Sequence, residues 1–87
     1  RAMTSSPLKL TELRKDEGAI ITGFVDEASE ITIRLREIGF AEGDNVMPLH
    51  FGLFGRNPMT VRVNGAVIAL RRKDASVITV SRQKHIS

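Results

Sequence analysis

The pair Asn64-Gly65 constrains the fold of this chain more than any other short segment. Residues 59–63 alternate between apolar and polar side chains, and an uncharged run, Ala-Val-Ile-Ala-Leu, occupies residues 66–70. Asn-Gly between two such segments is the strongest short-range signal for a β-hairpin, because both residues tolerate the positive φ angles of a type I′ turn. We therefore predict two antiparallel strands joined by this pair.

Three further segments have the composition of β-strands. Residues 19–25 are rich in β-branched side chains, and Gly23 within them indicates a bend or a bulge. Residues 45–51 alternate with period two, and Pro48 places this strand at a sheet edge or a bulge. Residues 76–80, Ser-Val-Ile-Thr-Val, form the closing strand. The chain is therefore predicted to be mainly β, with about five short strands.

One short amphipathic helix is predicted between the first two strands. Asp26 or Ser29 can cap its N-terminus, and Gly39 supplies the left-handed conformation that often ends a helix. Phe40 follows this glycine, and we expect it to fold back over the helix end, as hydrophobic residues beside glycine caps do. Three apolar residues share one helix face and are predicted to join the core: Ile31, Leu35 and Ile38.

The length of 87 residues limits the architecture to a single domain. A chain of this size buries only about 60–65% of its unfolded surface, so it builds one compact core. Few strands cannot fill two sheets, but a sheet that closes on itself also covers its own edges. We predict a small, partly open, SH3-like barrel over residues 8–82, a disordered or vector-derived lead-in over residues 1–7 and a frayed tail over residues 83–87.

Composition excludes several classes of protein. The absence of cysteine removes disulfides, thiolate zinc sites and cysteine nucleophiles. No apolar run approaches the roughly 18 residues of a membrane span. We also expect no apolar signal segment. The carboxylates fall mostly at turns and helix ends, where capping explains them, and no Walker-type loop occurs. We therefore expect a cytoplasmic protein that is not an enzyme and does not insert into the membrane.

The positive charge of the chain is mild. The net charge is +3, and there is no Trp or Tyr to stack on nucleic-acid bases, so we do not expect a nucleic-acid partner. Solvated strand ends explain the basic residues adequately. These residues gather in two places, Arg71-Arg72-Lys73 and the group Arg82, Lys84 and His85.

The order of the motifs provides a resemblance to a known family. In sequence they are Leu8, Leu10 and Leu13 before Gly18; residues 19–24; residues 34–44, Arg-Leu-Arg-Glu-Ile-Gly-Phe-Ala-Glu-Gly-Asp; Gly55 and Pro58; residues 63–75; and finally Ile78 and Val80. This ordered set, covering most of residues 8–80, resembles the FeoA family. FeoA proteins are small, cytoplasmic and SH3-like, and they accompany FeoB, the G-protein-containing membrane transporter for ferrous iron.

The resemblance implies an accessory protein of ferrous iron uptake. Such a protein would bind the cytoplasmic region of a FeoB-like transporter, lie at the inner membrane only through that partner, and regulate its GTPase activity, assembly or gating. The residues do not distinguish the G domain, the membrane part or a second copy of this chain as the contacted surface. Required cofactors are not expected.

Apolar residues at turns are the candidates for partner contact. They are Leu53 and Phe54, flanked by glycines, together with Phe40; Arg56 belongs to the same loop as the first two. The corresponding loop of the family usually reads Pro-Leu-Gly-Asp-Pro, whereas this chain has Leu-Phe-Gly-Arg-Asn-Pro at residues 53–58. Any role of the family's acidic residue in that loop is therefore not carried over.

Two alternative functions remain open at this stage. The chain could be a metal-binding module, with His50 and His85 as weak candidate ligands for Fe²⁺ or Zn²⁺, although a ferrous site needs a cluster of imidazole and carboxylate groups. It could instead resemble the SH3-like C-terminal domain of metal-dependent repressors. We expect no segment for DNA binding to precede Leu8, which disfavours direct repression.

Overall fold

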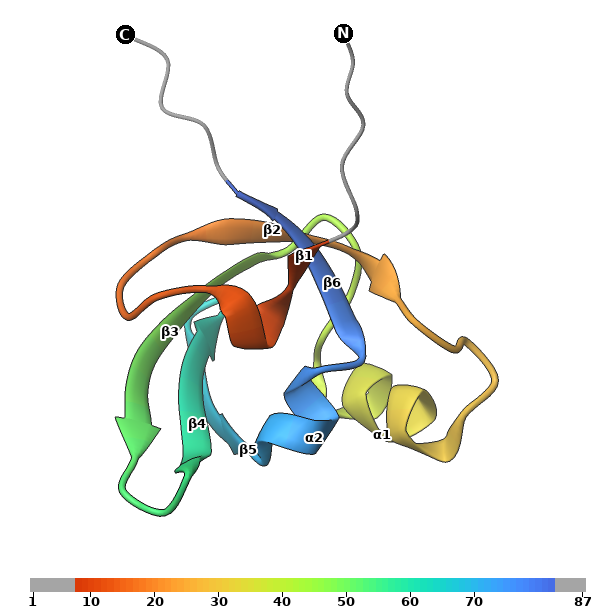
Figure 1. The fold of residues 1–87 in the computed structure, drawn as a ribbon. Helices are drawn as coiled ribbons and strands as arrows, with labels where there is room; N and C mark the ends of the chain where they lie inside the picture. Colours follow the sequence, from red (N-terminus) through yellow and green to blue (C-terminus); the bar gives the residue numbers. More distant parts are fainter. Residues whose placement is uncertain (1–7, 83–87) are drawn as a thin grey trace, which may run out of the picture.

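The computed structural model describes residues 8–82, which form one antiparallel sheet of six strands (Figure 1). The spatial order is β1-β6-β2-β3-β4-β5, so β1 and β5 lie at the two ends of the sheet. The predicted class, a mainly β, partly open barrel, is confirmed. Along the chain the elements are β1 (Leu8–Lys9), the 3-10 turn η1 (Leu10–Glu12), β2 (Ala19–Phe24), α1 (Glu30–Ile38), β3 (Asn45–Gly52), β4 (Arg56–Val63), β5 (Ala66–Leu70), α2 (Arg72–Ala75) and β6 (Ile78–Arg82).

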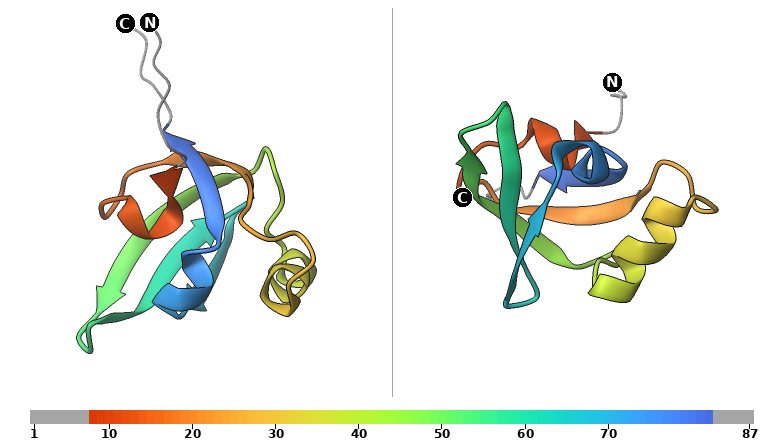
Figure 2. Two further views of the ribbon diagram at one scale, coloured as in Figure 1. Left: turned by 45° about the vertical axis from the view of Figure 1, so that its right-hand side comes forward. Right: turned by 90° about the horizontal axis from the view of Figure 1, so that it is seen from below.

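The sheet is strongly bent, and the short helices cover different parts of it. Strands β2 and β3 pair only at Ala19 and Ile20 before they diverge toward α1. Turn η1 and helix α2 pack against each other, and α2 also contacts β4. Helix α1 and the β3–β4 hairpin tip lie at opposite ends of the molecule (Figures 1 and 2). No helix among residues 8–82 is long and apolar enough to cross a membrane.

The structure corrects the predicted strand count. The segment Leu8–Lys9 was not predicted as a strand, yet it pairs with β6 through Leu8 and Val80. The long helix therefore lies between the second and third strands rather than between the first two. Between β5 and β6, residues Arg72–Ala75 form one turn of helix, α2, in which the Ala75 N–H donates to the Arg71 carbonyl at 3.0 Å.

The hydrophobic core fills the inside of the bent sheet. Phe40 is fully buried within it, and its backbone N–H donates to the Leu35 carbonyl at 3.0 Å. Gly39, at φ 133°, allows this turn, so the predicted glycine cap and the folding back of Phe40 are confirmed. The buried apolar residues are Leu10, Leu13, Ala19, Ile21, Phe24, Leu35, Phe40, Val46, Met59, Val61, Val63, Leu70, Ala75, Ile78 and Val80.

The buried face of α1 differs from the predicted one. Leu35 is buried and Ile31 is partly buried, but Ile38 is 45% exposed and Thr32 is fully buried. Thr32 can be buried because its polar groups are hydrogen-bonded. Its hydroxyl donates to the Asp26 carbonyl at 2.6 Å, and its N–H donates at 3.1 Å to the side chain of Ser29, the N-cap residue. Phe40 fills the core beyond the helix end, and Ile38 stays at the surface.

Two predicted irregularities of the strands are present. The pairing of β2 with β6 shifts register between Ile21 and Gly23. The pairing of β3 with β4 shifts between Pro48 and His50, so Pro48 lies at a bulge as expected. The carbonyl of Pro48 accepts a hydrogen bond from the Asp16 N–H at 2.7 Å. Pro48 has no N–H to donate, and a bulge is one of the places where a sheet tolerates the missing donor.

Candidate interaction surface

The tip of the β3–β4 hairpin presents two large apolar side chains to solvent. Leu53 is 90% exposed and Phe54 is 84% exposed, the highest values among the large hydrophobic residues of the described chain. The tip is ordered by a hydrogen bond from the Asn57 N–H to the Phe54 carbonyl at 3.0 Å. We call Leu53 and Phe54 the apolar tip. Two of the predicted contact residues, Leu53 and Phe54, thus lie at the tip of one hairpin.

The loop that the sequence places at residues 53–58 is shorter in the structure. Strand β3 extends to Gly52 and β4 begins at Arg56, so only residues 53–55 connect them. Gly52 permits this tight turn, because a Cβ atom at that position would lie 1.9 Å from the Asn57 carbonyl oxygen. The apolar tip is therefore held by two paired strands rather than carried on a long loop.

Arg56 is the first residue of β4, next to the hairpin tip, and its side chain is oriented by an aromatic ring. Its guanidinium carbon is 4.1 Å from the centre of the Phe51 ring, a cation–π contact. The residue adopts a positive φ of 66°, which turns the chain into β4. Arg56 thus places a fixed positive charge next to the apolar tip.

Asn57 connects the hairpin to helix α2. Its side-chain oxygen accepts a hydrogen bond from the Arg72 backbone N–H at 2.7 Å. This bond brings the basic segment Arg71-Arg72-Lys73 next to the start of β4. We call these three residues together with Arg56 the cationic strip. The sequence contained the run of three basic residues, but its position beside residue 57 depends on a contact between distant parts of the chain.

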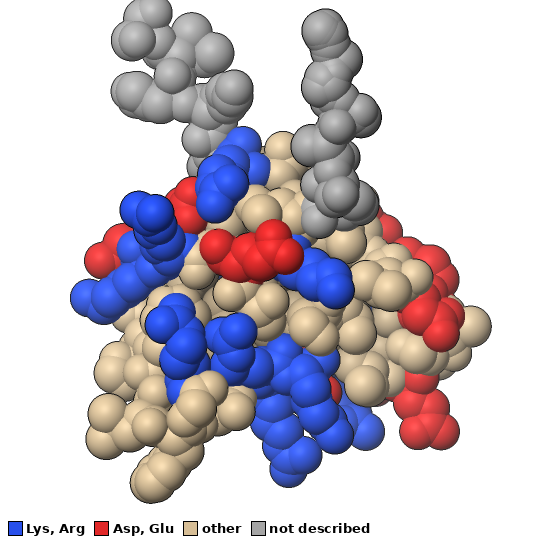
Figure 3. Space-filling model, in the orientation of Figure 1, with Lys and Arg blue, Asp and Glu red and all other residues tan. Residues whose placement is uncertain are grey.

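Charge is distributed unevenly over the surface. In Figure 3, Lys and Arg gather over the lower middle of the molecule beside the uncharged hairpin tip, whereas Asp and Glu gather toward the edge that carries α1. The four residues of the cationic strip make no ion pair within residues 8–82. By contrast, Arg36 and Arg82 are paired with carboxylates. The hairpin end is thus an apolar projection beside an unneutralised positive surface.

The carboxylates with altered pKa values lie away from this surface. Glu17 accepts a hydrogen bond from the Arg14 N–H at 2.8 Å and pairs with Arg82, and these two contacts lower the pKa of the Glu17 carboxyl. Bidentate pairing with Arg36 lowers the pKa of the Glu42 carboxyl to about 2. Both groups are held as carboxylates at neutral pH, so neither is suited to act as a general base near pH 7.

The other predicted site residues are not brought to the hairpin tip. Phe40 is fully buried, so its side chain belongs to the core and is removed from the candidate contact surface. His50 is exposed on β3, opposite Thr60 on β4. His85 lies outside the described residues. Within residues 8–82, no group of three His, Cys, Asp or Glu side chains is placed to hold a metal ion.

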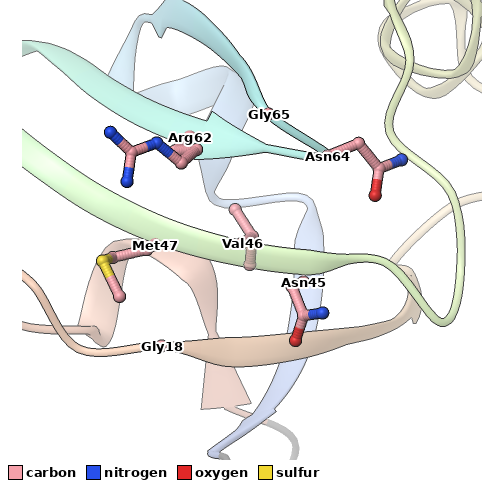
Figure 4. Close-up of a pocket in the computed structure, with 7 residues that line it drawn as sticks. All are labelled: Gly18, Asn45, Val46, Met47, Arg62, Asn64 and Gly65. Carbon is pink, nitrogen blue, oxygen red and sulfur yellow. The ribbon is translucent and has the colours of Figure 1, made fainter.

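A shallow hollow of about 320 Å³ crosses β3 on another part of the sheet (Figure 4). It is lined by Gly18, Asn45, Val46, Met47, Arg62, Asn64 and Gly65. Arg62 is the one ionisable residue in this lining, and a guanidinium is too weak an acid to exchange protons near neutral pH. The hollow therefore lacks the base and nucleophile that catalysis requires.

Comparison with known proteins identifies the family. The FeoA domain model matches residues 8–82, the same residues that form the barrel. The chain belongs to the FeoA family. This family is associated with ferrous iron transport. A search of curated proteins gave no match.

Two solved FeoA proteins support this assignment. FeoA of Chlorobium tepidum is 29% identical with a TM-score of 0.78, over 92% of this chain and 74% of that one. FeoA of Stenotrophomonas maltophilia, solved as a zinc complex, is 30% identical with a TM-score of 0.74, over 85% of this chain and 89% of that one. The latter is described as a prokaryotic SH3 domain protein and a suggested ferrous iron transport activating factor. The SH3-like character of the barrel is thereby confirmed.

Metal-dependent repressors share the fold. A manganese-dependent transcriptional repressor, solved with manganese, is 18% identical with a TM-score of 0.79, and the match covers 92% of this chain but 38% of that one. At this identity the likeness concerns the fold alone. The sequence expectation that a repressor domain resembles this barrel is confirmed, without any implication of DNA binding.

Proposed function

We propose that this FeoA protein binds the cytoplasmic region of a FeoB-type ferrous iron transporter through the apolar tip and thereby regulates the transporter. The observation that supports the proposal is the exposure of Leu53 and Phe54, at 90% and 84%, on an ordered hairpin. Exposed apolar groups that an ordered turn does not need are characteristic of protein contact sites. The family's association with ferrous iron transport suggests the transporter as the partner.

The proposal does not assign chemistry to this chain. Regulation would follow from the contact alone, if the bound protein favours one conformation of the transporter. A ligand shifts such an equilibrium only by its difference in affinity for the two states. Binding must therefore depend on the nucleotide state of the G domain if GTP hydrolysis is the regulated step.

The direct test is calorimetry of this protein with the purified cytoplasmic region of the transporter. Wild type should bind saturably, and the Leu53→Asp/Phe54→Asp variant should bind at least about tenfold more weakly, since contact residues of this kind often cost more than 1 kcal/mol. Equal affinity of the two proteins would exclude the hairpin as the contact. Absence of binding by wild type would exclude the partner.

A matched control separates loss of contact from a general effect of added charge. Val25 and Ile33 are 61% and 50% exposed and lie at the α1 end of the molecule. The Val25→Asp/Ile33→Asp variant adds the same two charges away from the hairpin. It should retain wild-type affinity. Both double variants should unfold close to the wild-type temperature, because their side chains contribute little to the core.

A further inference from the structure

The cationic strip beside the apolar tip makes no ion pair with a carboxylate of the described chain. Arg56, Arg71, Arg72 and Lys73 are absent from the ion pairs formed among residues 8–82, although Arg36 and Arg82 each find a carboxylate. Solvated charges of one sign are common on surfaces, but here one guanidinium rests on an aromatic ring and the backbone of α2 is attached to the hairpin. Arg56 is fixed over Phe51 at 4.1 Å, and α2 is fixed to the hairpin by the bond from Arg72 to Asn57 at 2.7 Å.

One nitrogen of the strip is both buried and unsatisfied. Nη1 of Arg72 is inaccessible to solvent and has no hydrogen-bond partner within residues 8–82. Buried polar nitrogen atoms nearly always have a partner, and a guanidinium has donors only, so the missing group is an acceptor. Carboxylates are the acceptors that fit a guanidinium best, because they take two parallel N–H groups. Because Nη1 is inaccessible to solvent, a carboxylate of a partner reaches it only when the Arg72 side chain turns outward. This orphaned donor lies on the same residue whose backbone is joined to the hairpin.

We infer that the protein partner presents carboxylates against the cationic strip, next to the pocket that receives Leu53 and Phe54. This inference rests on the proposed function for the identity of the partner. The chemistry of the partner is instead inferred from the cationic strip. The apolar tip favours a protein over a nucleic acid, since a phosphate backbone offers no pocket for an aliphatic side chain and the described surface has no Trp or Tyr for base stacking. The strip would steer the partner by charge, and the apolar tip would anchor it.

The first test asks, without the transporter, whether the cationic strip binds carboxylates. Glutarate, a dicarboxylate, should cause saturable NMR shifts at residues 56–57 and 71–73, and neutral glutaramide should not. Arg72→Gln should remove the response at residue 72, because it replaces the guanidinium by a shorter, uncharged amide. The inference is overturned if glutarate shifts the exposed residues Lys15 and Arg34 equally, or if no saturable response occurs.

The second test uses the cytoplasmic region of the transporter and a charge reversal. Arg71→Glu/Lys73→Glu should weaken binding at least about tenfold, and raising NaCl from about 50 to about 500 mM should weaken wild-type binding in parallel. Lys15→Glu/Arg34→Glu changes the net charge equally at exposed positions away from the strip and should have little effect. Equal losses in the two variants would show that net charge, rather than this strip, is recognised.

The outcomes separate the inference from the proposed function. If the transporter region does not bind wild type but glutarate titrates the strip, the transporter is the wrong partner and the inference stands. If the transporter binds and neither the charge reversal nor salt changes its affinity, the inference fails while the proposed function stands. A third outcome would also overturn the inference. In it, duplex DNA binds wild type more tightly than the transporter region does, and Arg71→Glu/Lys73→Glu abolishes the DNA binding.

Discussion

The guanidinium of Arg36 holds both oxygens of the Glu42 carboxylate, through Nη1 at 2.9 Å and Nη2 at 2.8 Å. Nη2 also donates to Glu27 at 2.7 Å, and the guanidinium carbon lies 4.4 Å from the centre of the Phe24 ring. Arg36 therefore joins helix α1 to the loop before it, the loop after it and the end of β2. A helix of nine residues is marginal by itself, so such attachments help to hold it on the barrel.

This cluster predicts a specific response to acid. Hydrogen bonds from Arg36 lower the pKa of Glu42 from 4.5 to about 2. Because the folded pKa is the lower one, the stabilisation is complete above about pH 4.5 and is lost as the pH falls through about 2. Glu42→Gln should lower the urea midpoint at pH 7, and its difference from wild type should shrink toward zero at pH 2.

The control for this response is a carboxylate on α1, the helix that carries Arg36. Glu37 is exposed and makes no ion pair within residues 8–82. Glu37→Gln should leave the urea midpoint at pH 7 nearly unchanged. A difference between wild type and Glu42→Gln that persists undiminished at pH 2 would contradict the assignment, because the Glu42 carboxylate would then not be its source.

The two phenylalanines predicted as contact residues should behave oppositely on truncation. Phe40 is fully buried and Phe54 is 84% exposed. Phe40→Ala should lower the free energy of unfolding by about 3–5 kcal/mol, since it leaves a cavity in the core, whereas Phe54→Ala should change it by less than about 0.5 kcal/mol. Urea denaturation followed by circular dichroism measures both. Equal losses would mean that Phe54 packs in the folded protein.

Local rules explain why part of this fold could be predicted. The Asn64-Gly65 turn has φ angles of 51° and 83°, and Gly39 ends the helix at 133°, both as the residue types require. Strand β5 and the cap at Ser29 also follow from neighbouring residues alone. These features depend on backbone preferences within a few positions, which a sequence displays directly.

The features that could not be predicted from the sequence depend on contacts between distant residues or on polar groups. The two residues of β1 become a strand only by pairing with β6 at the other end of the domain. Thr32 is buried because its hydroxyl finds the Asp26 carbonyl, which a count of apolar residues does not register. For the candidate site, Leu53 and Phe54 were found from their glycine flanks, but the link from Asn57 to Arg72 spans 15 residues and had no local signal.

Gly52 should be the least replaceable glycine of the hairpin. An added Cβ would lie 1.9 Å from the Asn57 carbonyl oxygen, which is backbone and cannot move aside alone. Gly52→Ala should destabilise the protein by about 1–3 kcal/mol, the range typical of overpacking, and should shift the amide resonance of Arg72, whose N–H donates to the Asn57 side chain. Thermal unfolding and NMR measure the two effects; an unchanged melting temperature would show that the hairpin relaxes freely.

Metal binding by the folded domain should be weak. The zinc complex of the S. maltophilia protein shows that a relative can hold a metal, but His50 has no cluster of further ligands within residues 8–82. Zn²⁺ and Fe²⁺ need several convergent ligands for tight binding. Anaerobic calorimetry with Fe²⁺, and calorimetry with Zn²⁺, should therefore give no saturable micromolar binding that His50→Ala removes. A micromolar site lost in His50→Ala but retained in His85→Ala would establish His50 as a ligand and overturn this expectation.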